Sequence, residues 1–270
     1  MRRLPNWLVW HSLAILILSA GAISIVLLLP YHARVQSWVL VSAVMAAITL
    51  VAGHGVTGCW LGFLIDRTNR MSLTRLQVAL WTLTIFPALF AAAISNARFG
   101  DPAPLSIAIP IEMWILMGIS TATVVGTPLV RVKKTTQPAI RREKASSPIV
   151  LDEAYRLQNL ENQGFDVSSF DSDEKPLVKR SPADASVSDL FRGVEAAKAA
   201  YLDLSRVQMF FVTLVLVVAY AIALGFKLAA TGTIHEFPAV DAGMVALMGI
   251  SHVGFIARMA VPQSGGARAD

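Results

Sequence analysis

Charged residues and cysteine are both scarce in this chain. Asp, Glu, Lys and Arg together make up 15% of its 270 residues, whereas a soluble globular protein usually carries roughly 25%. Cys59 is the one cysteine, which excludes an intramolecular disulfide and every CxxC metal or redox motif. Histidine is nowhere spaced with aspartate or glutamate as a metal site requires, and no nucleophile elbow, phosphate loop or Rossmann glycine pattern occurs. The sequence therefore predicts neither a cofactor nor a bound metal, and it gives no positive evidence for catalysis.

Apolar residues are abundant instead, at 55% of the chain, and they come in long blocks. A helix needs about 20 apolar residues to cross the hydrocarbon core of a bilayer. Six blocks predict an all-α integral membrane protein with six transmembrane helices, at about 7–29, 38–65, 76–94, 110–130, 207–228 and 238–261. We expect Gly53-His54-Gly55 to interrupt the second span and Pro87 to kink the third.

The net charge of +5 is better explained by membrane topology than by nucleic-acid binding, because Lys and Arg favour the cytoplasmic side of a membrane protein. With the N-terminus inside, ten of these residues lie at inner span ends and three in outer links. The ten are Arg2, Arg3, Arg67, Arg70, Arg75, Arg131, Lys133, Lys134, Arg206 and Arg258, and the three are Arg34, Arg98 and Lys227. We therefore predict a multi-pass protein of the cell membrane with both termini and the long loop at 131–200 in the cytoplasm.

Two stretches of the chain repeat each other at an offset of 131 residues (204 − 73). The run 73–77 reads LTRLQ and the run 204–208 reads LSRVQ, while LMGIS occurs at both 116–120 and 247–251. Between 73–130 and 204–261, 15 of 58 positions are identical. Both units begin on the inner side, so they predict a parallel repeat of two helical hairpins, spans three-four and five-six. Coincidence in apolar sequence is the alternative.

The predicted spans divide the chain into five parts. They are an N-terminal hairpin at 1–70, a first repeat unit at 71–130, a cytoplasmic loop at 131–200, a second repeat unit at 201–262 and a tail at 263–270. Within the loop, the polar composition of 163–185 predicts disorder. After it, Ser186 or Ser188 is expected to N-cap a helix that continues through Ala200.

Six polar residues of the repeat lie near the inner ends of the predicted spans. They are Arg75, Gln77 and Thr82 in the first unit and Arg206, Gln208 and Thr213 in the second. Lipid offers a polar group no hydrogen-bond partner, so such groups usually face protein or water. One interpretation is a polar ring at the inner mouth of a pathway. In the other, the arginines snorkel to the headgroups while Gln and Thr bond a neighbouring helix.

Four further ionisable residues are candidates for an ion pathway. Glu112 and Asp241 follow prolines where spans four and six begin, which is typical of a helix start but would also fit an acidic outer vestibule. His54 and His252 lie inside apolar spans and can act as proton relays or ion ligands, or can simply pack through a hydrogen bond. His11 and His54 could be imagined as facing haem ligands, but no other residue supports this.

The leading functional hypothesis is an oligomeric channel or transporter for a small ion. Two hairpins are few to enclose a pathway, and small-residue stripes suit helix association, so a homo-oligomer in the lipid bilayer is expected. The alternative is a membrane anchor, scaffold or sensor that recruits a cytosolic partner through the 131–200 loop. That loop has a basic block at 131–144 and an acidic block at 152–174.

Overall fold

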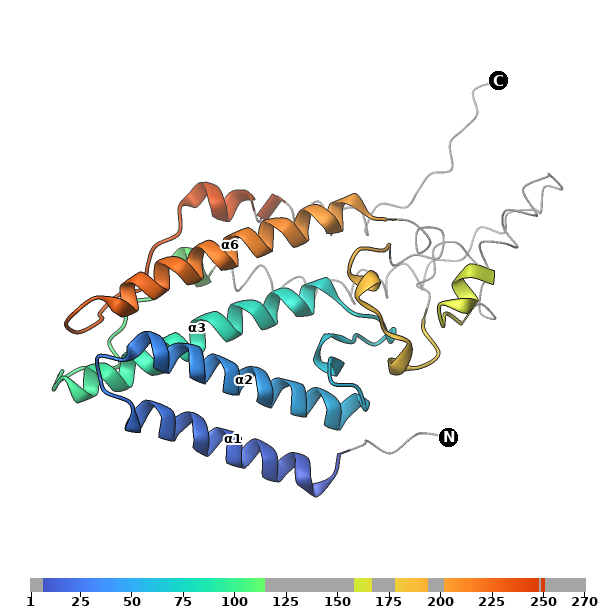
Figure 1. The fold of residues 1–270 in the computed structure, drawn as a ribbon. Helices are drawn as coiled ribbons and strands as arrows, with labels where there is room; N and C mark the ends of the chain where they lie inside the picture. The colour runs from blue at the N-terminus through green and yellow to red at the C-terminus, as the bar shows by residue number, and fades with distance from the viewer. Residues whose placement is uncertain (1–6, 115–157, 167–177, 194–201, 248, 251–270) are drawn as a thin grey trace.

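The computed structural model describes residues 7–114, 158–166, 178–193, 202–247 and 249–250 (Figure 1). These residues form helices, with isolated bridges but no β-strand among them. Four helices are long and apolar enough to cross a membrane: α1 (Val9–Leu28), α2 (Arg34–Thr57), α3 (Leu73–Arg98) and α6 (Leu204–Ala229). The all-helical prediction is therefore confirmed for the described residues, and four of their helices are candidate membrane spans.

Spans four and six are described only where they begin. Residues 111–114 and 242–247 are helical, as expected for the first turns of these spans. Most of the remainder, including the whole LMGIS segment at 116–120 and two residues of the one at 247–251, lies outside the described residues. The six-span count and the internal repeat stay predictions.

Successive helices α1, α2 and α3 reverse direction, whereas α6 runs the same way as α3 and lies beside it (Figure 1). The loop segments 158–166 and 178–193 lie at the end of the bundle where α3 and α6 begin. Following the predicted orientation, we name this the inner end and the opposite one the outer end. A shared direction for α3 and α6 is what a parallel repeat requires.

The main core lies between α3 and α6. Trp81, Ile85 and Ala88 recur three or four residues apart and therefore face one side of α3. Tyr220 and Leu224 do the same on α6. The rings of Trp81 and Tyr220 meet edge to face with their centroids 6.0 Å apart, a geometry that favours aromatic pairs.

The sequence prediction for span two was wrong in its bounds. α2 begins at Arg34 and ends at Thr57, because Gly58 adopts a left-handed conformation (φ 76°) and its N–H bonds the His54 carbonyl at 2.8 Å. The chain then turns through a short 3-10 helix, η1 (Gly62–Leu64). The predicted interruption at Gly53-His54-Gly55 is also absent from α2, which is continuous there.

Gly53 instead permits a close contact between α2 and η1. A Cβ atom built on Gly53 would lie 2.7 Å from the Phe63 backbone nitrogen. We expect Gly53→Ala to destabilise the protein by about 1–3 kcal/mol, because backbone must move to admit the methyl group. Gly21→Ala is the matched control, since a Cβ on Gly21 meets nothing within 4 Å. Thermal unfolding in detergent measures both, and equal melting temperatures would contradict the expectation.

The outer arginines have structural partners at helix ends. Arg34 is buried and donates to the carbonyls of Gly232 at 2.8 Å and Ala230 at 2.5 Å, beyond the last turn of α6. Arg98 donates to the Leu29 carbonyl at 2.5 Å, just past α1. A cation near a helix C-terminus satisfies carbonyls that have no helical partner and interacts favourably with the helix dipole.

The expectation of disorder at 163–185 was wrong for the part that the structure describes. Residues 163–166 and 178–185 have a defined conformation, and Phe165 and Lys179 are both buried. Ser186 precedes only a 3-10 helix, η3 (Val187–Leu190), rather than the start of a helix to Ala200. η3 ends there because Phe191 turns the chain, and residues 194–201 lie outside the described part.

Candidate functional site

Two histidines meet near the inner end of α1 and α2. His11 is the third residue of α1, and His54 is the fourth from the end of α2. Their Nε2 and Nδ1 atoms are 3.0 Å apart, and the rings stack with centroids 5.3 Å apart. His11 is fully buried, and His54 is half-buried. We call these two residues the histidine pair.

The backbone of Leu8 determines which nitrogen of His11 carries a proton. The Leu8 N–H donates to His11 Nδ1 at 3.0 Å, so neutral His11 holds its proton on Nε2 and donates it to His54 Nδ1. The Leu8 carbonyl is 3.3 Å from the same Nδ1. Leu8 thus places both a backbone donor and a backbone acceptor within reach of His11 Nδ1.

Tryptophan rings surround the histidine pair. Trp10 stacks on His11 with centroids 3.6 Å apart, Trp7 stacks on it at 5.5 Å, and Trp60 lies 4.6 Å from His54. Gly55 makes room for this group, because a Cβ there would lie 2.5 Å from the Trp7 ring. Tryptophan is enriched where a membrane meets water. The site is thus a polar pair inside an uncharged aromatic shell.

The separation of the two nitrogens decides the chemistry of the pair. Nitrogens joined by a hydrogen bond lie about 2.7–3.2 Å apart, and the observed separation is 3.0 Å. The arrangement is therefore that of a hydrogen bond between the two rings.

Arg206 occupies a different, buried polar cluster at the inner end. Its Nη1 lies 3.5 Å from the Asp189 carbonyl, and its Nε is 4.0 Å from Asp203. Asp189 itself pairs with Lys179 at 2.9 Å, and Arg70 is 4.0 Å from the same carboxylate. Loop segment 178–193 therefore covers the start of α6, and Arg206 belongs to this ionic cluster rather than to an open mouth.

Gln77 and Thr213 hold α3 against α6. The Gln77 Nε2 donates to Thr213 Oγ1 at 2.5 Å, and both residues are buried. This is the interhelical hydrogen bond that the packing interpretation expects. Gln208, which corresponds to Gln77 in the second unit, is exposed on α6.

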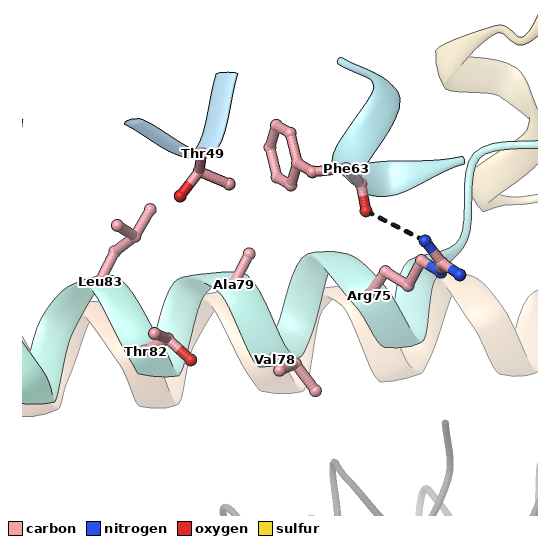
Figure 2. Close-up of a pocket in the computed structure, with 7 residues that line it drawn as sticks. All are labelled: Thr49, Phe63, Arg75, Val78, Ala79, Thr82 and Leu83. Carbon is pink, nitrogen blue, oxygen red and sulfur yellow. Dashed lines mark hydrogen bonds between the residues drawn. The ribbon is translucent and has the colours of Figure 1, made fainter. Parts of the chain in front are cut away.

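Arg75 and Thr82 line a groove on the side of α3 (Figure 2). The groove has a volume of about 290 Å³ and is completed by Thr49, Phe63, Val78, Ala79 and Leu83. In Figure 2 the Arg75 guanidinium points to the Phe63 carbonyl, to which it donates at 3.5 Å. Thr49 of α2 and Leu83 of α3 close the other end.

The outer acids lie at helix starts. Asp241 accepts a hydrogen bond from the Gly243 N–H at 2.8 Å, which is N-cap chemistry, and its side chain is exposed. Glu112 is half-buried in the first described turn of span four. His252 lies outside the described residues. The described candidate residues thus occupy separate environments, apart from Gln77 and Thr213, which are joined by a hydrogen bond.

Sequence reasoning missed the buried partners of these residues. His11 was noticed only as an unsupported haem ligand, although a histidine in an apolar span is the signal that also singled out His54. Asn96, fully buried near the outer end of α3, bonds both the N–H and the carbonyl of Ile234 at 2.8 and 2.7 Å. The buried Lys179–Asp189 pair had no local signal, since both residues lie in a polar loop.

Searches against protein-family models, curated proteins and solved structures found no match to this chain.

Proposed function

We propose that this protein is an oligomeric membrane channel or transporter for a small ion whose activity depends on a proton held by the histidine pair. The observation that carries the proposal is the hydrogen bond from His11 Nε2 to His54 Nδ1 at 3.0 Å, inside a tryptophan shell. Ionisable groups within membrane segments are costly, so they commonly mark ion or proton pathways.

The surroundings of the pair suit a site that gains and loses one proton. Both ring nitrogens of His11 have hydrogen-bonding groups beside them, the Leu8 backbone at Nδ1 and His54 Nδ1 at Nε2. The neighbouring rings of Trp7, Trp10 and Trp60 are uncharged. Histidine changes charge between about pH 5 and 8, which spans the cytoplasmic range.

Proton binding also has a mechanical consequence that supports a transport role. α1 and α2 contact each other along their length, and the histidine pair joins them at the inner end. A change of charge on either ring changes the strength of this hydrogen bond, because hydrogen bonds with an ionised partner are stronger than neutral ones. The charge of the pair can thus bias the position of α1 against α2, as a gating contact requires.

The anchor or scaffold hypothesis finds less support in the described part of the loop. Lys179 and Asp189 form an ion pair with each other, and their side chains are 2% and 0% exposed. Leu190 and Phe191 pack with Met209 and Phe210 of α6. Segment 178–193 thus contributes to the bundle itself, and a recruiting surface would have to come from other parts of the loop.

Reconstituted liposomes test the proposal. We expect flux of K⁺, Na⁺ or H⁺, followed with ion-sensitive dyes, to differ between about pH 5.5 and 8, because histidine side chains change charge in that range. His54→Gln should abolish the pH response while it keeps a polar side chain in place of the ring.

The matched control is His235→Gln. His235 is exposed in the outer loop and bonds Thr233 at 2.8 Å, so its loss should leave the pH response unchanged. Absence of flux for all three ions would defeat the transport proposal. A pH response that survives His54→Gln in a protein with unchanged melting temperature would remove the histidine pair from it.

A further inference from the structure

Two faces of α3 recur in the sequence of α6 at the same offset of 131 (208 − 77). What we call the Gln face holds Gln77, Ala88 and Ala92 in α3, and Gln208, Ala219 and Ala223 in α6. What we call the Thr face holds Arg75 and Thr82 in α3, and Arg206 and Thr213 in α6. At about 100° per residue, the glutamine and threonine positions lie roughly 140° apart around each helix.

Within one chain, the Gln face of α3 packs against the Thr face of α6. Gln77 donates to Thr213 at 2.5 Å. Ala88 and Ala92 are both 0% exposed and lie in the same core as Leu216 and Leu224. Small residues on one helix let the partner backbone approach closely, which stabilises helix pairs inside a membrane. When these two faces meet, they therefore form a Gln–Thr hydrogen bond and a closely packed alanine contact.

The complementary pair of faces is not covered by any of the residues that the structure describes. Gln208, Ala219 and Ala223 are all exposed on α6. On α3 the Thr face opens into the groove of about 290 Å³ lined by Arg75 and Thr82. The exposed Gln face of α6 thus carries the same residue types as the buried Gln face of α3. The groove on α3 carries the same residue types as the buried Thr face of α6.

We propose that a second copy of this chain occupies the groove, with the Gln face of its α6 against the Thr face of α3 and its Gln208 bonded to Thr82. The contact repeats between chains the one that joins α3 to α6 within a chain. It is heterologous, since each copy offers a different face to its two neighbours. Because the two faces are not opposite on the helix, the row of helices curves and can close into a ring around an axis along the membrane normal.

This contact would build the oligomer that the proposed function requires, so the inference rests on that function. The experiment that tests the contact measures the proximity of two residues and not ion flux. Cys59→Ser provides a background without cysteine. Chains with Gln208→Cys are mixed with chains with Thr82→Cys in liposomes and treated with a short bifunctional thiol reagent. We expect cross-linked dimers from the mixture and little cross-linking from either variant alone.

The internal contact gives a positive control for this experiment. Gln77→Cys combined with Thr213→Cys in one chain should cross-link within the monomer, because the same residue types there already bond at 2.5 Å. Cross-links of Gln208→Cys with itself would indicate a symmetric dimer and overturn the proposal. The proposal would also be overturned if the mixture failed to cross-link while the internal pair reacted. In that case lipid covers the Gln face of α6.

A second measurement does not depend on cysteine. Ala219→Trp should convert the oligomer to a monomer in bilayer nanodiscs, at least a tenfold loss of the assembled fraction, because the indole fills the face that must approach closely. Val218→Trp is the matched control, since Val218 is 48% exposed and points about 100° away around the helix. Equal masses for both variants would contradict the proposal. Loss of flux with intact cross-linking would defeat the proposed function alone.

Discussion

Replacing Asp189 with alanine is expected to destabilise the inner end of the bundle by about 3–5 kcal/mol, because Lys179 would stay buried without its counter-charge. The two side chains are 0% and 2% exposed, and their charged atoms are 2.9 Å apart. Asp189 also accepts from the Ser186 N–H at 2.9 Å, which would lose its partner as well. Hydrogen–deuterium exchange across 178–193 and trypsin cleavage after Lys179 should both become faster.

Two further variants test whether the unpaired buried charge causes the loss of stability in Asp189→Ala. Glu161→Ala removes a second ion pair of the same loop, with Arg180, whose side chains are both 53% exposed. It should cost less than about 1 kcal/mol, as surface pairs usually do. The double variant Lys179→Met, Asp189→Leu should recover only part of the loss, because it removes the buried lysine charge but leaves Arg70 and the Ser186 N–H without Asp189. Slow exchange in Asp189→Ala would refute this account of the inner end.

The sequence was sufficient to predict the four long apolar helices, because hydropathy over roughly 20 residues is the main signal of a candidate membrane span. α1, α3 and α6 begin and end within a few residues of the predicted spans. The end of α2 was missed because it depends on one backbone angle, at Gly58. The residues after it are as apolar as the helix, so hydropathy gives no signal there.

The folded loop segments were missed for a different physical reason. The polar composition of 163–185, taken as an average, predicts disorder. It gives no weight to the single residues Phe165 and Lys179, which are both buried and pack against each other. Lys179 lies over the Phe165 ring at 5.0 Å and pairs with Asp189. Which charges are buried depends on the distant surface of α6, and no local pattern contains that information.

The candidate residues were found more readily than their partners. His54 and Gln77 stand out because polar groups are costly in a span. Their partners, His11 and Thr213, lie 43 and 136 residues away, and the pairing depends on the register and rotation of packed helices. Residues at equivalent positions of the repeated motif also differ in exposure, since Gln77 is buried and Gln208 is exposed. Only the packing of α3 on α6 distinguishes them.

Asn96→Leu should cause the second large loss of stability, roughly 2–5 kcal/mol, because it strands two buried backbone groups at about 1–3 kcal/mol each. Asn96 Oδ1 accepts from the Ile234 N–H at 2.8 Å, and Nδ2 donates to the Ile234 carbonyl at 2.7 Å. Leucine has a similar volume, so the packing of the site is largely kept. Thermal unfolding of the full chain in detergent measures the change.

The two outer loops should also separate in this variant. Beside Asn96, the backbones of Ala108 and His235 are joined by a hydrogen bond of 2.7 Å, and the Phe237 N–H bonds the Ala108 carbonyl at 2.9 Å. Without the asparagine, amide exchange at these positions should accelerate together, because Ile234 loses both of its hydrogen bonds to the Asn96 side chain. Ala97→Leu, at the exposed neighbouring position, should leave both exchange and melting temperature unchanged. If Asn96→Leu behaves like Ala97→Leu, the loops are held by their own backbone pairing and not by Asn96.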